Sequence, residues 1–199
     1  MKQLQEFLVR LKKEIDAGKQ FEFWNYLNES EKSMKSIGEK IAGTIEENVQ
    51  IRGKIVLGKG SVLRSGSVLE GTVVVGENCR IGPNAYLRSG TIVADNCHVG
   101  ISEVKNSIIL SNSNVPHFNY VGDSILGENV NLGAGTKIAN LRHDNANVKV
   151  LVNGRLVDSG RRKLGALIGS NTKTGINSSI NCGAIVPNNS KIMPNEFFK

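Results

Sequence analysis

The chain has 199 residues, of which 39% are hydrophobic and 22% charged, and its formal net charge is +7. No stretch approaches the ~20 consecutive apolar residues of a membrane-spanning helix, and the polar N-terminal segment lacks an apolar signal core, so we expect a cytoplasmic protein without membrane association. The three cysteines (Cys79, Cys97 and Cys182) form an odd set without metal-ligand spacing, which favours a reducing compartment and predicts no metal site.

The first 42 residues are expected to form two short amphipathic helices. Apolar residues at helical spacing mark them, namely Leu4, Phe7, Leu8, Leu11 and Ile15 in the first helix and Phe21, Phe23, Trp24, Leu27, Met34, Ile37 and Ile41 around the second. We interpret residues 1–42 as a helical cap on the first turns of the repetitive domain that follows, because that domain would otherwise end in unpaired strand edges. The alternatives are packing on a neighbouring subunit and recognition of a partner.

Residues 43–199 carry an internal period of six. Every sixth position from Ile45 to Val99 is aliphatic, ten in succession, and a small or β-branched residue follows four places later in nine of the ten units. This period fits a short strand followed by a tight corner, and three such units close a triangular coil that stacks on the next at about 4.8 Å. The sequence therefore predicts a parallel β-helix with aliphatic ladders inside, glycines at the corners, and Cys79 stacked on Cys97.

The repeat is interrupted twice, and we expect functional residues at both breaks. The frame is lost after Val99 and resumes three residues out of phase at Leu126; a second insert runs over about 141–167. In that insert Asn153-Gly154 joins two β-prone runs, which predicts a protruding β-hairpin.

Much of the excess charge lies in the second insert. Residues 141–163 hold six basic and two acidic residues, which is more than half of the net +7. This concentration indicates a local anion site, and the chain has no basic platform interleaved with aromatics, so nucleic acid is not an expected partner. We expect the insert to provide anion contacts rather than fold stability, the alternative being a solvated basic face.

The most specific signal is a set of motifs at the first break and beyond it. Residues 117–123 read HFNYVGD, 129–136 read NVNLGAGT, and 139–140 read AN. Together they closely resemble the acetyltransferase half of bifunctional UDP-N-acetylglucosamine pyrophosphorylase/glucosamine-1-phosphate N-acetyltransferase. The hairpin insert and the run SGRRKLGA at 159–166 resemble the archaeal sugar-1-phosphate form of that family. The resemblance covers roughly residues 43–192.

The resemblance implies a left-handed β-helix that assembles as a homotrimer with active sites between subunits. It implies an acetyl-CoA-dependent N-acetyltransferase that acts on an amino-sugar phosphate, such as glucosamine-1-phosphate, in nucleotide-sugar synthesis. By this resemblance His117 is the catalytic base, the backbone of Ala134 lies against the acetyl carbonyl, Asn140, Tyr120 and Asn131 hold the amino sugar, and Arg88, Lys105 and Lys163 bind its phosphate. Arg161 and Arg162 offer forked donors that suit the phosphates of a sugar or of coenzyme A, and we assign them to acetyl-CoA.

A base of near-neutral pKa suits histidine, which supports the role that the resemblance gives to His117. The structural alternative for Tyr120 and Asn131 is a place in the framework of the solenoid. The chain has no glycine-rich nucleotide loop, so we expect no pyrophosphorylase activity; a separate nucleotidyltransferase is a candidate partner. Two other functions stay open: an O-acyltransferase of the same fold, and a non-catalytic homologue that serves as a structural or regulatory partner of such a nucleotidyltransferase.

Overall fold

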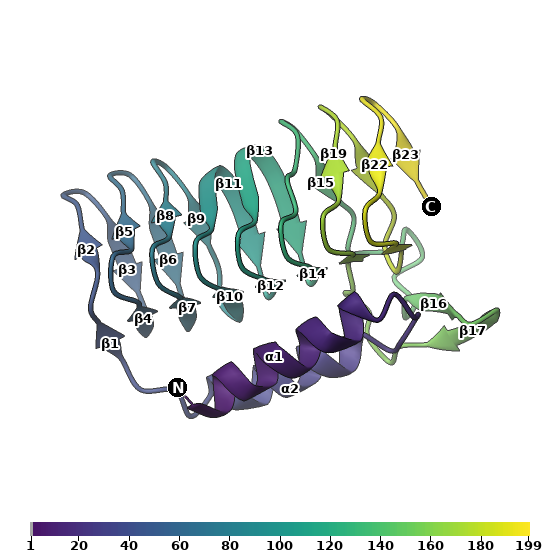
Figure 1. The fold of residues 1–199 in the computed structure, drawn as a ribbon, viewed down its shortest axis with the longest axis horizontal. Helices are drawn as coiled ribbons and strands as arrows, with labels where there is room; N and C mark the ends of the chain where they lie inside the picture. The colour runs from purple at the N-terminus through teal and green to yellow at the C-terminus, as the bar shows by residue number, and fades with distance from the viewer. Residues whose placement is uncertain (1) are drawn as a thin grey trace.

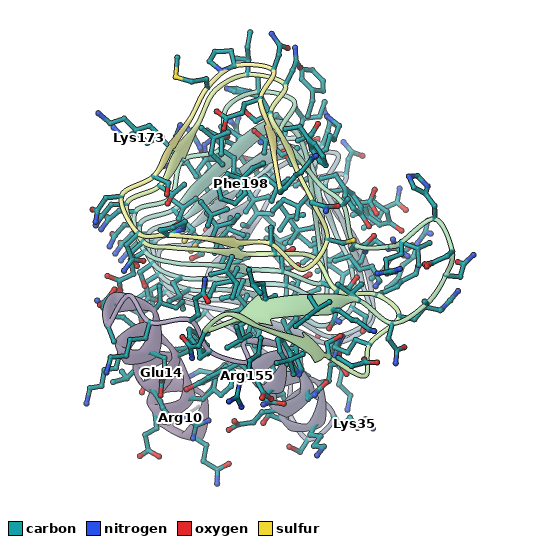
Figure 2. The ribbon with its side chains drawn as sticks, turned by 90° about the vertical axis from the view of Figure 1, so that its right-hand side faces the viewer. Arg10, Glu14, Lys35, Arg155, Lys173 and Phe198 are labelled. Atoms are coloured by element: carbon teal, nitrogen blue, oxygen red, sulfur yellow. The ribbon has the colours of Figure 1, made fainter. Side chains whose placement is uncertain are left out.

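The chain folds into a three-sided solenoid with two helices and a hairpin along one side (Figure 1). The structure is a computed structural model and describes residues 2–199. Helices α1 (Lys2–Asp16) and α2 (Trp24–Met34) precede the coils, and every pairing between strands of the coils is parallel. Seen from its end, the solenoid is a triangle with Phe198 inside the last coil (Figure 2). The structure thus confirms the expected parallel β-helix with N-terminal helices and a hairpin insert.

Each side of the triangle is a stack of short parallel strands. The first face contains β1 (Lys40–Ile41), β4 (Ile55–Leu57), β7 (Val73–Val75), β10 (Thr91–Val93), β12 (Ile108–Ile109), β14 (Ile125–Leu126), β18 (Leu167–Ile168) and β21 (Ile185–Val186). The second face contains β2 (Thr44–Ile45), β5 (Val62–Leu63), β8 (Arg80–Ile81), the first halves of β11 (His98–Lys105) and β13 (Asn114–Gly122), β19 (Lys173–Thr174) and β22 (Lys191–Ile192). The third face contains β3 (Gln50–Arg52), β6 (Val68–Glu70), β9 (Tyr86–Leu87), the second halves of β11 and β13, β15 (Lys137–Ile138), β20 (Ser179–Ile180) and β23 (Phe197–Phe198).

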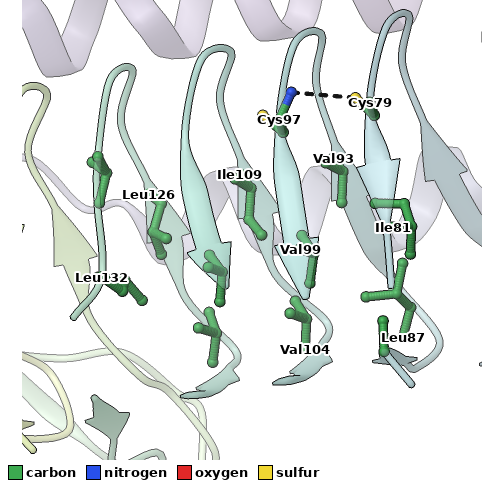
Figure 3. Packing of buried hydrophobic residues seen from close by; sticks show 14 of the residues in the cluster. Cys79, Ile81, Leu87, Val93, Cys97, Val99, Val104, Ile109, Leu126 and Leu132 are labelled. Carbon is green, nitrogen blue, oxygen red and sulfur yellow. Dashed lines mark hydrogen bonds between the residues drawn. The ribbon is translucent and has the colours of Figure 1, made fainter. Parts of the chain in front are cut away.

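The predicted ladders fill the interior. Leu57, Val75 and Val93 pair in register on the first face, and all are buried. Cys79 and Cys97 are buried thiols of neighbouring coils, and the Cys97 amide lies 3.5 Å from the Cys79 Sγ (Figure 3). This confirms the predicted stacking of the two cysteines.

Asparagine turns the corners of the solenoid alongside glycine, which has positive φ at eleven of the described positions. Among residues 2–199, fifteen non-glycine residues have positive φ, and thirteen of them are asparagines. Asparagine tolerates this left-handed conformation because its short amide forms local hydrogen bonds. The two other residues are Phe118 and Asp123, and both belong to the motif at 117–123.

The first break in the repeat is a shortening of two coils. Val93 pairs with Ile109, sixteen residues later, and Ile109 pairs with Leu126, seventeen residues later. Two such coils are three residues shorter than two regular ones, which accounts for the phase shift. Strands β11 and β13 run through the corner between the second and third faces, with a register shift between Ile101 and Glu103.

The N-terminal helices lie along the first face and do not cover an end of the solenoid (Figure 1). Their buried residues, among them Leu11 and Leu27, pack against outward side chains of the first face such as Val74 and Ile108. From Val56 onward that face is apolar on both of its surfaces, so it needs a cover there. This differs from the expected cap on the first coils. No helix among the described residues is long and apolar enough to cross a membrane.

The hairpin is present and contributes to the core. Strands β16 (Lys149–Val152) and β17 (Arg155–Asp158) pair antiparallel across Asn153-Gly154. Val148 and Val150 are buried in the same cluster as the helices, and the Asn153 amide donates to Gln20 Oε1 at 2.7 Å. The expectation that the insert adds no fold stability was therefore wrong, because its apolar face extends the packing that covers the first face.

Candidate active site

His117 lies at the corner where β13 passes from the second face to the third. It pairs with Ile101 of β11, and the next residue, Phe118, has a φ of 51°. An aromatic residue rarely adopts this conformation, and here it turns the chain directly after His117. The imidazole is exposed and makes no hydrogen bond within residues 2–199, so both ring nitrogens are accessible to a ligand.

A backbone donor lies beside His117 in the adjoining coil. The Gly135 amide donates to the His117 carbonyl at 2.9 Å, which places the preceding residue, Ala134, next to the histidine. The half-buried Ala134 N–H has no acceptor in the described part of the chain. An unengaged N–H next to a candidate base is suited to the stabilisation of an oxyanion.

Further along β13, a buried carboxylate organises a polar cluster. The Asp123 side chain is 2% exposed. It accepts hydrogen bonds from Lys105 Nζ at 3.0 and 3.1 Å, from Asn106 Nδ2 at 2.8 Å and from Asn140 Nδ2 at 2.6 Å. These donors come from the two coils on either side of Asp123, and the parallel register stacks them with it at the corner between the third and first faces.

Tyr120 is held by the same cluster. Asn140 Nδ2 donates to Tyr120 Oη at 3.1 Å. Burial raises the pKa of Tyr120, the carboxylates of Asp123 and Glu103 raise it further, and the hydrogen bond from Asn140 opposes them. The phenol therefore keeps its proton at neutral pH, and that proton is available to a ligand because the oxygen is the acceptor toward Asn140.

Arg88 is a second cation near the third face, and it lies one coil before Lys105. Arg88 Nη1 donates to Glu103 Oε1 at 2.9 Å, and the guanidinium lies 5.7 Å from the ring centroid of Tyr86. Register pairing places Tyr86, Glu103 and Tyr120 in one column. Arg88, Lys105 and Tyr120 thus share one edge of the solenoid.

Asn131 is not brought to this edge. It bridges to Asn114 and Lys173 on the second face, on the other side of the corner that carries His117. Within one chain, the sequence-derived site is therefore divided between two faces.

The three residues of the basic run after the hairpin, 161–163, also lie in different surroundings. Lys163 bridges to Leu141, and the following residue donates its amide to the Asn140 carbonyl at 3.0 Å, so Lys163 lies beside the polar cluster. Arg162 is exposed. Arg161, assigned to acetyl-CoA from the sequence, instead directs Nη2 to Glu31 at 2.6 Å and Nη1 to Asn28 at 2.6 Å, both on α2.

Sequence reasoning gave no role to Asp123, Asn106, Glu103 or Glu31. Asp123 stood within the quoted motif, and its acidic side chain directly after a glycine was a usable signal. Glu103 lies on β11, whose bulge the period of six did not reveal, and Asn106 directly follows that strand. Glu31 carried no signal, because its contact with the site depends on where α2 packs.

Comparison with known proteins identifies the family to which the chain belongs. Residues 69–190 match the family described as the GMPPB C-terminal domain. The chain is 42% identical over 182 residues to the bifunctional sugar-1-phosphate nucleotidylyltransferase/acetyltransferase of Sulfurisphaera tokodaii, with 90% of this chain and 45% of that protein covered. It is 53% identical over 173 residues to the bifunctional protein GlmU of Methanococcus maripaludis strain C7, with 86% and 42% covered. Among solved structures, LpxA of Acinetobacter baumannii aligns over 78% of this chain and 64% of that chain, with 16% identity and a TM-score of 0.38.

The stacked parallel coils and the polar edge define a β-helix of hexapeptide repeats that carries a candidate active site. The chain belongs to the family of GMPPB C-terminal domains. It spans less than half the length of the two curated relatives named above.

Proposed function

We propose that the protein is an acetyl-CoA-dependent N-acetyltransferase that acts on an amino-sugar phosphate such as glucosamine-1-phosphate. The observation that carries the proposal is the arrangement along β13. The His117 imidazole has no hydrogen-bond partner within residues 2–199, and the N–H of Ala134, likewise without an acceptor there, lies beside it in the adjoining coil. Tyr120, which accepts a hydrogen bond from Asn140, lies three residues further along β13. The relative from Sulfurisphaera tokodaii, a bifunctional sugar-1-phosphate nucleotidylyltransferase/acetyltransferase, supports the same reaction class.

In the reaction, the amine nitrogen of the sugar attacks the thioester carbonyl carbon of acetyl-CoA. His117 accepts the proton that the amine loses, and the Ala134 N–H donates to the oxygen that becomes negative in the tetrahedral intermediate. The C–S bond then breaks, the thiolate of coenzyme A leaves with the bonding electrons and takes up a proton, and the amide product remains. An unprotonated amine is required, which suits a base that works near neutral pH.

The polar cluster holds the acceptor. Lys105 and Arg88 are each paired with one carboxylate and offer N–H donors to the sugar phosphate, and Lys163 at the end of the insert adds a positive charge. Both of the Asn140 amide contacts run through its nitrogen, so its oxygen is left to accept a hydrogen bond from the amine. The exposed Arg162 is retained as a contact for the phosphates of acetyl-CoA.

We propose a homotrimer in which neighbouring copies complete each site. The support is the position of Asn131 on the second face, separated from Tyr120 by the His117 corner, so that a second copy is needed to bring an Asn131 to the third face. Light scattering at micromolar concentration should report about three times the 21.5 kDa of one chain. A monomer that still acetylates would contradict a site shared between subunits.

We expect the reaction to take place in the cytoplasm, where free cysteines such as these three stay reduced. A separate nucleotidyltransferase that takes the acetylated sugar phosphate is the corresponding partner. The deciding experiment is a thiol-release assay with acetyl-CoA against a panel of amino-sugar phosphates and their hydroxyl analogues. Release with the amines alone supports the proposal. Release with the hydroxyl analogues indicates an O-acyltransferase, and no release with any acceptor indicates a non-catalytic homologue.

A further inference from the structure

We propose that Asp123 is a positioning residue of the acceptor site, and that helix α2 holds this residue in place through Glu31 and Arg161. The N-terminal helices would then be part of the active-site framework as well as a cover for the first face. This inference rests on the proposed function, because it concerns the same site.

The burial and the hydrogen bonds of Asp123 set it apart from other carboxylates of the molecule. Its side chain is 2% exposed and meets donors from Lys105, Asn106 and Asn140 within 3.1 Å, with Arg161 Nη2 at 3.7 Å. Its backbone is fixed on both sides, since its N–H donates to the Lys105 carbonyl at 2.8 Å and its C=O accepts from Gly165 at 2.9 Å. A carboxylate removed from water in this way needs all of these partners.

The consequence for the site follows from the donor and acceptor roles. An ionised carboxylate only accepts hydrogen bonds, so the Asn140 atom 2.6 Å from Asp123 is the amide nitrogen. The same nitrogen donates to Tyr120 Oη. Asp123 thereby fixes which way the Asn140 amide points: its oxygen is left for the acceptor, and the Tyr120 proton is left to donate.

Helix α2 reaches this carboxylate through two bridges. Asn106 Nδ2 donates to Asp123 and also to Glu31 Oε1, each at 2.8 Å. Arg161 lies between the same two carboxylates, with Nη2 2.6 Å from Glu31 and 3.7 Å from Asp123. With Lys105 included, two cations face two carboxylates, so the cluster is balanced in charge and each member depends on the others.

The first test is the substitution Asp123→Asn, which keeps the shape and tolerates the φ of 51°. Asparagine presents a donor where three donors now converge, so the Asn140 amide loses its fixed orientation. We expect kcat for the amino-sugar phosphate to fall roughly 10- to 100-fold, the size of effect that misplaced reacting groups produce, with the KM for acetyl-CoA changed little.

A double-mutant cycle separates positioning from a general structural role. If Asp123 acts through Asn140, the variant Asp123→Asn/Asn140→Ala should turn over no more slowly than Asn140→Ala alone. Losses that multiply in the double variant would overturn the proposal, because they would show that Asp123 acts independently of Asn140.

The role of helix α2 is tested with Glu31→Gln, which keeps an oxygen for Arg161 but removes the charge. Its expected loss in kcat over acceptor KM is about 2- to 5-fold, the size typical of a partly exposed ion pair, and it should vanish in an Asn140→Ala background. Glu29→Gln is the matched control, since Glu29 lies on the same helix but pairs with Arg10. The Glu31→Gln experiment decides the proposal even where Asp123→Asn fails to fold.

The outcomes distinguish this inference from the function on which it rests. An active wild type whose Asp123→Asn and Glu31→Gln variants lower only the melting temperature, with unchanged acceptor kinetics, would overturn the inference and leave the function standing. An inactive wild type that also fails to bind glucosamine-1-phosphate in calorimetry would overturn both. Loss of acceptor turnover in both variants, cancelled in the Asn140→Ala background, supports the proposal.

Discussion

The first and third faces of the solenoid share one interior and differ outside. On both, the inward residues are aliphatic ladders of the same cluster. The outward column of the first face is apolar, as at Val74 and Ile108, and lies under the helices, whereas the outward column of the third face carries Tyr86, Glu103 and Tyr120 and is open. One repeat thus supports two tasks: outward apolar residues bind the chain's own helices, and outward polar residues form the site.

The largest expected effect lies at the boundary of the third face. His117→Ala should reduce turnover roughly 10²–10⁴-fold, the usual contribution of a positioned base. The melting temperature should stay near that of the wild type, because the imidazole is exposed and outside the ladders. The residual rate should rise with pH as more of the amine becomes unprotonated. Steady-state kinetics and thermal melts test this, with the exposed His143→Ala as control, and wild-type turnover in His117→Ala would remove it from the mechanism.

On the first face we expect a substitution to lower the stability and to leave the turnover unchanged. Ile92→Ala removes a side chain that is 1% exposed between the strands and the helices, and should lower the free energy of unfolding by about 2–5 kcal/mol. The same substitution at Ile176, which is 54% exposed, should change it little. Denaturant unfolding measures both. At a temperature where Ile92→Ala is folded, its kcat should match the wild type; a large loss of kcat without a loss of stability would contradict the division between the faces.

The interior was predictable from the sequence because each coil repeats the same local requirement. An aliphatic residue every sixth position is enough to specify the ladders, and the Asn-Gly pair is enough to specify the hairpin turn. The position of the helices also had a signal that went unused. Val56, Val74 and Ile92 each precede an inward aliphatic residue, one coil apart, so the first face was marked as apolar on both surfaces.

The site was predictable only in part. The motif pointed to His117, Tyr120 and Asn140, which lie on or beside β13. The cluster around Asp123 was not predictable, because its members converge from three coils and, through Arg161, from the far end of the insert. A period describes which residues stack, but it does not describe which side chain reaches across a corner.

A smaller effect is expected from substitutions in the basic run at 161–163. They should separate the residues of this run that bind a substrate from the residue that stabilises the fold. Arg162→Gln/Lys163→Gln should raise the KM for the acceptor or for acetyl-CoA about 10-fold, as expected for lost charged hydrogen bonds, and should weaken its dependence on salt. Both side chains are exposed, so the melting temperature should hardly change. Arg161→Gln should instead lower the melting temperature, because its guanidinium bridges the insert to α2. Equal effects of the three substitutions on KM alone would contradict this division.

The smallest expected effect is on the pH dependence of the stability that Glu31 of α2 contributes through its contacts with Arg161 and Asn106. Burial by itself would raise the pKa of Glu31, but the hydrogen bonds from Arg161 and Asn106 together outweigh it and hold this pKa below its ordinary value of 4.5. The folded protein therefore binds the Glu31 proton less readily than the unfolded chain does, so the carboxylate adds stability above pH 4.5, and this stability is lost as the pH falls through the lowered value. The stability difference between wild type and Glu31→Gln should accordingly be constant near neutral pH and shrink in acid. Urea unfolding across the acid range measures it, with Glu29→Gln as control, and a difference that grows as the pH falls would show that Glu31 is held in its protonated form.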